Sequence, residues 1–320
     1  METSSQTLRS RFFSIDLRSL ALFRIGLGLV VLADVIIRSV DLNAHYTDAG
    51  ILPRLAIFSG TEVSWRQFLS LHLLNGSVEW QALLFTLNGA AALALMVGWR
   101  TRAANVATWF LYLSMYSRNE MVIQGSDRLT TLLLLWALFL PTGARWSIDA
   151  LRRPENQEVP KRVLSWASAA VILQICSIFW FTIPLKSGAE WTTDYNAVYF
   201  SVYCSWASVM APLFHSLSYE TLRTLTIITL IAEGGTPFLF FVPYRSGWFR
   251  LTGCLLLAGM FLAFLGVFNI GMWVPVAFVA TALFLPDIFW DTVLPRLWGG
   301  GVRRAEALAS RIEHFAVTRV

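Results

Sequence analysis

Long apolar runs separated by short polar segments dominate the chain. The runs extend over roughly 20 residues, enough for a helix to cross a bilayer, and they lack the two-residue alternation of membrane barrel strands. Only helices and closed barrels satisfy their own backbone hydrogen bonds in lipid, so the pattern predicts helices. The predicted spans are 19–38, 80–99, 103–118, 128–141, 163–185, 222–243, 248–268 and 272–290.

The predicted fold is therefore an all-α polytopic integral membrane bundle of about eight transmembrane helices. It divides into an N-terminal segment (1–18), one transmembrane domain (19–290) and an amphipathic tail (291–320). Residues 51–74 are predicted to form an interfacial helix on the outer side. Residues 195–218 are apolar but contain Pro212, His215 and many serines, so an interfacial or re-entrant element is favoured over a ninth span.

Composition supports this class. The chain is 56% hydrophobic and 14% charged, whereas a soluble domain carries about 25% charged residues. With eight spans, the predicted inner segments hold seventeen Lys and Arg residues and the outer ones hold seven. This bias predicts that both termini are cytoplasmic. Membrane lipid is the expected surrounding, and the short basic loops are poor nucleic-acid sites.

Metal binding is not predicted. Cys176, Cys204 and Cys254 are far apart in the sequence, and the four histidines share no metal-ligand spacing.

Lys186 is the strongest candidate for chemistry. It follows a long apolar run, precedes Trp191, and is the only lysine or arginine between Arg162 and Arg223. A lysine at this place is either an anchor that reaches the headgroups or a base. A base needs partial desolvation, which disfavours the ammonium form, and Trp191 could help to supply it.

Glu233 is the second candidate, because an ionisable residue inside a span is costly and is a functional candidate by default. It precedes Gly234, Gly235 and Pro237, which can free backbone carbonyls and open a polar cavity. The alternative is a protonated glutamate bonded to a neighbouring helix. In both cases we expect it to face the bundle interior.

Three further polar residues are candidates for the pocket. Arg24 lies near the inner end of the first span and could instead reach the headgroups. Asp127 lies at the head of a helix and could instead be a cap, and Asn119 lies in the same outer loop. Asp34 lies four residues from the outer end of the first span and could also reach water.

Several short motifs, each weak alone, occur together in order: Phe23-Arg24-Ile-Gly-Leu-Gly28, Tyr46-Thr-Asp-Ala-Gly50, Val97-Gly-Trp-Arg-Thr-Arg102, Asn119 with Gly125-Ser-Asp127, and Leu140-Pro-Thr-Gly-Ala-Arg-Trp-Ser-Ile-Asp149. Together they resemble the HTTM family, bacterial membrane proteins related to the transmembrane part of vitamin K-dependent gamma-carboxylase. The resemblance extends from about residue 14 to 290 and implies a bacterial inner-membrane protein.

The resemblance implies candidate roles. Carboxylases of this kind use a lysine as the base that starts oxidation of reduced vitamin K. Lys186 corresponds to that lysine, because it lies at the matching distance before Trp191. Glu233 falls on an acidic position of a later span. A reduced quinone of the vitamin K or menaquinol type is then the implied cofactor.

This sequence also departs from the carboxylases. The carboxylases carry a His-x-x-Asn element shortly before a Gly-Met pair; counting back from Gly271-Met272, those two places are Phe261 and Phe264 here. The family's Asn-His pair in the third outer loop is Asn119-Glu120 in this sequence. Two functions therefore stay open. One is a quinol-dependent, carboxylase-like oxidative enzyme with Lys186 as base. The other is a non-catalytic membrane partner or maturation factor for an exported peptide.

Overall fold

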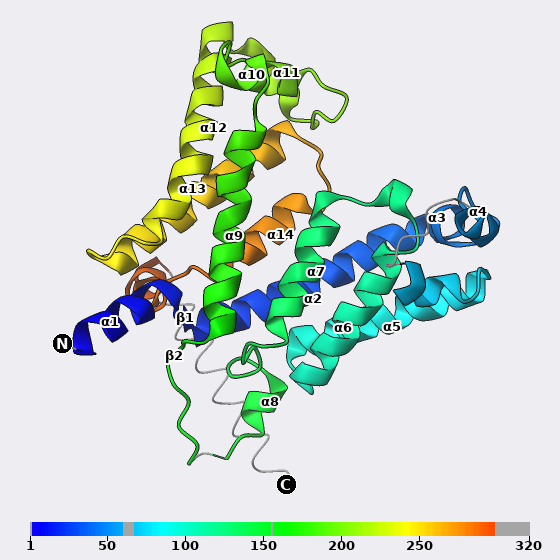
Figure 1. The fold of residues 1–320 in the computed structure, drawn as a ribbon, viewed down its shortest axis with the longest axis horizontal. Coiled ribbons are helices and arrows are strands. Elements are labelled where there is room, and N and C mark those ends of the chain that lie inside the picture. Colours follow the sequence, from blue (N-terminus) through cyan, green and yellow to red (C-terminus); the bar gives the residue numbers. More distant parts are fainter. Residues whose placement is uncertain (1, 60–66, 155, 298–320) are drawn as a thin grey trace.

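The computed structural model describes residues 2–59, 67–154 and 156–297, and within them the chain is almost entirely helical (Figure 1). Most of the tail predicted at 291–320 lies outside the described residues. The longer helices after the N-terminal segment occupy the places of the predicted spans: α2 (Leu17–Val40), α5 (Val78–Val97), α6 (Thr101–Tyr116), α7 (Gly125–Ala137), α9 (Trp166–Leu185), α12 (Tyr219–Leu239), α13 (Ser246–Val267) and α14 (Trp273–Ala282).

In the described part of the chain, four helices are long and apolar enough to cross a membrane. They are α2, α5, α9 and α13. Of the others, α6, α7 and α14 have 16, 13 and 10 residues, and α12 carries Glu220, Arg223 and Glu233 in its 21 residues. The chain is thus a multi-pass membrane protein, and eight crossings remain a prediction.

Short elements lie at the two ends of the long helices, and those at the predicted outer end form two separate groups, one at the top and one at the right of Figure 1. At one end lie α1 (Glu2–Phe13), α8 (Ile148–Leu151) and a two-stranded ladder, in which β1 (Ile15–Asp16) pairs antiparallel with β2 (Arg162–Val163). At the other end, predicted to be outer, lie α3 (Leu42–Tyr46), α4 (Arg54–Phe58), η1 (Gln67–Leu69), η2 (Leu71–Leu73), η3 (Glu120–Val122), α10 (Ala189–Thr192), α11 (Ala197–Val202) and η4 (Ala211–Ser216).

The segment 195–218 forms no span-length helix. It contains α11 and η4, and between them Ala207 forms a β-bridge with Phe268, in the connection from α13 to α14. Short elements fit its proline and serines, because serine competes for backbone hydrogen bonds and proline lacks a donor.

Local sequence explains where the long helices begin. Asp16, Ser77, Ser165 and Ser218 are the N-cap residues of α2, α5, α9 and α12, and each side chain accepts a hydrogen bond from a first-turn amide.

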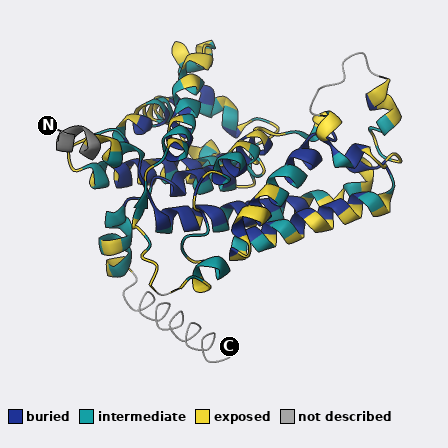
Figure 2. Ribbon diagram, turned by 60° about the horizontal axis from the view of Figure 1, so that its bottom comes forward, coloured by how far each residue is buried: buried dark blue, intermediate teal, exposed yellow. Residues whose placement is uncertain are grey.

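Close packing of α2 against α5 anchors one half of the bundle. Gly28 allows it, because a Cβ there would come within 2.8 Å of the Ala92 carbonyl oxygen. Small residues commonly permit such approaches between membrane helices. Figure 2 shows buried residues along the inward faces and exposed ones outside. The exposed residues include Leu29, Ile36 and Ile37, as expected of a lipid-facing surface.

Candidate functional site

Lys186 and Glu233 form an ion pair that joins α9 to α12. Lys186 is the C-cap residue of α9, and its Nζ donates to Oε2 of Glu233, near the middle of α12. The two side chains are only 17% and 9% exposed. Because water hardly reaches the pair, the attraction between the ammonium and the carboxylate is only weakly screened. Glu233 therefore faces the protein, as expected, and α12 continues as a helix through Gly234 and Pro237.

Trp191 covers the amine. The Nζ atom of Lys186 lies 4.8 Å from the centre of the Trp191 ring, a distance at which a cation is attracted to the aromatic face. Trp191 belongs to α10, which begins just after the lysine. The structure thus brings three of the predicted site residues together: Lys186, Glu233 and Trp191.

Glu233 also lines a partly open cavity of about 110 Å³ between the helices. Aromatic and aliphatic side chains form most of its wall, and Glu233 is its only ionisable lining residue. The lining comprises Leu129, Ile175, Ile178, Phe179, Thr182, Glu233, Met260, Phe261, Phe264, Trp273, Ala277, Ala280 and Thr281. This wall suits a flat, apolar ring with one polar group directed at the carboxylate.

Phe261 and Phe264, which replace the carboxylases' His-x-x-Asn pair, both line this cavity. Phe261 also packs against Phe179 across the space, with ring centres 6.4 Å apart. The apolar substitutions therefore fall in the cavity that contains the carboxylate, where they remove hydrogen-bonding groups and leave Glu233.

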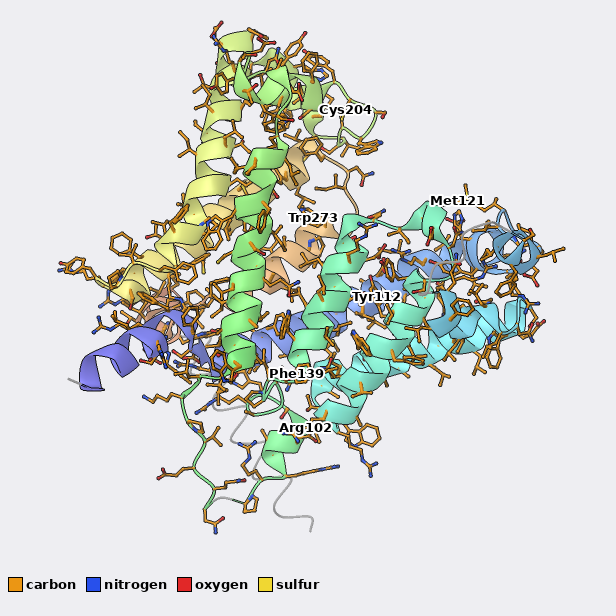
Figure 3. All side chains as sticks on the ribbon, in the orientation of Figure 1. Arg102, Tyr112, Met121, Phe139, Cys204 and Trp273 are labelled. Atoms are coloured by element: carbon orange, nitrogen blue, oxygen red, sulfur yellow. The ribbon has the colours of Figure 1, made fainter. Side chains whose placement is uncertain are left out.

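A wider outer cavity of about 650 Å³ lies next to the first. Its wall includes Gln124, Ser126, Trp206 and Asn269, and it shares Trp273 with the inner cavity. Figure 3 shows Trp273 at the start of α14, in the region between α9 and α7. Trp273 therefore lines both the inner cavity and a wider, mostly apolar vestibule on the predicted outer side.

A second buried polar cluster lies between α2, α6 and α7. Arg38 links two carboxylates: its Nε donates to Oδ2 of Asp34 over 2.9 Å, and its Nη2 donates to Oδ1 of Asp127 over 2.6 Å. The Tyr112 hydroxyl lies 2.9 Å and 3.0 Å from the same two oxygens. Arg38 also donates to the hydroxyl of Tyr46. We call these five residues the Arg38 cluster.

The Arg38 cluster changes the expected roles of Asp34 and Asp127. Asp34 is 3% exposed, so it does not reach water, which its place near the end of the span would have allowed. Asp127 is the N3 residue of a capping box whose N-cap is Gln124: its carboxylate accepts from the Gln124 amide, and it is also a partner of Arg38. The spacing of Asp34 and Arg38 by four residues was a usable signal for the pair, whereas no local pattern marks Tyr112.

Asn119 and Arg24 serve other parts of the molecule. Asn119 caps η3 and donates to the His45 carbonyl. Arg24 is fully buried, and its guanidinium donates to carbonyls of Thr142, Arg145, Met96 and Trp146 at the predicted inner end. The structure does not bring these two side chains into contact with Lys186 or Glu233, and Arg24 holds the loop around the Pro141–Asp149 motif.

In the described part of the chain, no three His, Cys, Asp or Glu residues form a group that could hold a metal ion.

His72 in the outer η2 turn makes the fold sensitive to acid. Burial lowers the pKa of His72 to about 4, assisted by the positive charge of Arg118 and opposed by the hydrogen bond to Gln81. The unfolded pKa is about 6.5, so between pH 6.5 and 4 only the unfolded chain gains this proton. The contribution of neutral His72 to the free energy of unfolding is complete above pH 6.5. It falls by roughly 3 kcal/mol as the pH drops to 4.

Thermal unfolding in detergent at pH 7 and pH 5 measures this loss. His72→Gln cannot titrate and should show a smaller difference between the two pH values. An unchanged difference in His72→Gln would assign the acid sensitivity to other groups.

Fold and site together define a mostly helical, multi-pass membrane protein with an ion pair whose carboxylate lines an apolar cavity. Comparison with known families agrees: the model of the HTTM domain matches residues 12–289. The match covers most of the chain, and the protein belongs to the HTTM family. No curated protein and no solved structure matches it.

Proposed function

We propose that this HTTM-family protein is a quinol-dependent membrane enzyme in which Lys186 is the base. The supporting observation is the Lys186–Glu233 pair, in which the carboxylate also lines an aromatic cavity. A lysine used only as a headgroup anchor needs no buried acidic partner, and its amine extends to water. Here the amine turns inward and is covered by Trp191.

The cavity residues fit a hydroquinone ring. Phe179, Phe261 and Trp273 offer flat apolar faces, and Glu233 offers a hydrogen-bond acceptor. When bound, the hydroquinone would supply two electrons and two hydroxyl protons for reaction with oxygen. The shared wall at Trp273 would let a substrate approach from the vestibule on the outer side.

Proton transfer within the pair prepares the base. Lys186 can accept a proton only as a neutral amine. Oε2 of Glu233 takes the ammonium proton, which leaves a lone pair on Nζ and two neutral side chains. The free Nζ would then take up a proton released by a ligand at the cavity wall, which Glu233 lines.

The alternative is a non-catalytic membrane partner or maturation factor for an exported peptide. Phe261 and Phe264 favour it, because they remove the hydrogen-bonding groups that a catalytic cavity commonly carries. In that case the Lys186–Glu233 pair would serve to hold α9 against α12.

Oxygen uptake by the purified protein in nanodiscs tests the proposal. We expect a reduced naphthoquinone to be oxidised faster than in empty discs, with quinone absorbance rising in step. The double variant Lys186→Met/Glu233→Leu removes both charges at similar volume, so it should fold and show only the empty-disc rate. A wild-type rate equal to that of empty discs would refute the enzyme and leave the partner role.

A further inference from the structure

A cavity of about 510 Å³ lies near the inner ends of α5 and α6, apart from the Lys186 site. Three arginines line it: Arg100, Arg102 and Arg153. The rest of the wall comes from Thr101, Ala103, Asp149 and the segment Leu140–Ala144. Neither candidate function described above uses this cavity.

The cavity carries uncompensated positive charge. Within the described residues, none of the three guanidinium groups has a carboxylate partner within 4.0 Å. Asp149 is the one acidic residue of the wall, and its oxygens already accept from Arg100 N, Thr101 N and Thr101 Oγ1 at 2.7–2.9 Å. The guanidinium groups of the cavity can therefore donate to an anion. The Asp149 carboxylate is already bonded to the residues at the start of α6.

The backbone at Arg100 is held in an unusual conformation. Its φ of 45° lies in the left-handed region, which costs a residue other than glycine of order 1 kcal/mol. The two hydrogen bonds from residues 100 and 101 to Asp149 hold it there. Arg153 is fixed on the same wall by a 3.3 Å hydrogen bond to the Ala144 carbonyl. The backbone from which the Arg100 side chain extends and the Arg153 guanidinium are thus held in place before any ligand binds.

Exposed apolar residues close in the sequence to the lining residues indicate that the cavity lies at the edge of the membrane. Trp99, Phe139 and Leu151 are 45%, 65% and 50% exposed, and the Arg100 guanidinium lies 5.6 Å from the centre of the Trp99 ring. Tryptophan beside a basic residue is typical of the membrane–water boundary. Figure 3 shows Arg102 and Phe139 at the same end of α6 and α7, away from Met121.

We propose that this cavity binds the phosphate of an anionic phospholipid on the predicted cytoplasmic side. Guanidinium groups suit phosphate because their N–H donors match its oxygens in pairs. The exposed apolar residues beside the cavity would contact the acyl chains, which a free phosphate lacks. Basic pockets at helix ends on the cytoplasmic side are known to bind such headgroups.

Binding of single lipids to the delipidated protein in detergent, measured by native mass spectrometry, tests this site. Phosphatidylglycerol should bind at least about tenfold more tightly than phosphatidylcholine. The triple variant Arg100→Gln/Arg102→Gln/Arg153→Gln should weaken phosphatidylglycerol binding about 100-fold, or roughly fivefold per arginine. Arg152→Gln changes charge in the same loop but lies outside the cavity wall, so its effect should stay below twofold.

Other outcomes would overturn the proposal. They are equal binding of the two lipids, a triple variant that binds phosphatidylglycerol like the wild type, or an Arg152→Gln effect as large as the triple. Displacement of the lipid by millimolar inorganic phosphate would show a free-phosphate site. If the triple variant does not fold, Arg102→Gln alone, at an exposed position, should still show the fivefold loss, and wild-type affinity would then refute the site.

Discussion

Replacing Lys186 by arginine is expected to lower quinol oxidation by roughly 100-fold or more while leaving the protein folded. The rate falls because a guanidinium does not deprotonate in proteins and cannot act as the base, and a positioned base contributes about 100-fold to 10,000-fold. The fold persists because arginine can still donate to Glu233. Oxygen uptake in nanodiscs measures the rate, and the unfolding temperature reports the fold.

The matched control is Lys161→Arg. Lys161 is the only other lysine of the chain, and it is exposed in the connection before β2. The same substitution there should leave the rate unchanged. If Lys186→Arg were as active as Lys161→Arg, the amine would be an anchor whose charge alone matters, and the base assignment would be wrong.

A measurement of ligand contact can be made without turnover. Reductive methylation with ¹³C-labelled formaldehyde gives methyl signals from the two lysines and the N-terminal amine. Addition of the oxidised quinone should shift the signal that is absent in Lys186→Arg and leave the Lys161 signal in place. Equal shifts of both lysine signals would indicate that the quinone partitions into the disc without binding at Lys186.

The hydrophobic pattern predicted the places of the long helices because each run is bounded by turn or capping residues. Ser77 and Ser218, for example, lie directly before the helices that they cap. The pattern could not decide which helices cross the membrane. Helix α14 has ten residues, and its packing against α2 and α13 provides burial that length alone would not.

The candidate site was predictable as single residues and less so as a pair. Lys186 and Glu233 each stood out as a rare ionisable group among apolar residues. They are 47 positions apart, and only the packing of α9 against α12 brings them together. The same limit applies to Arg38 and Asp127, which are 89 positions apart. The sequence offered Asp127 as a pocket residue or a cap and gave no sign of its partner.

Replacing Arg38 by methionine is expected to destabilise the fold by roughly 3–5 kcal/mol. Methionine keeps most of the side-chain volume, so the effect comes from charge. Asp34 and Asp127 would remain buried with no cation beside them, and Tyr112 has one hydroxyl proton for both carboxylates. Removing one partner of a buried ion pair leaves an unpaired charge that water cannot reach.

Arg223→Met provides the comparison. Arg223 forms an exposed pair with Glu220, in which the two side chains are 41% and 74% exposed, and such pairs contribute about 0–1 kcal/mol. Equilibrium unfolding in mixed micelles measures both variants. A loss in Arg38→Met no larger than in Arg223→Met would mean that water already reaches the carboxylates. Adding Asp34→Asn to Arg38→Met should recover part of the loss, because that change removes one of the two unpaired charges.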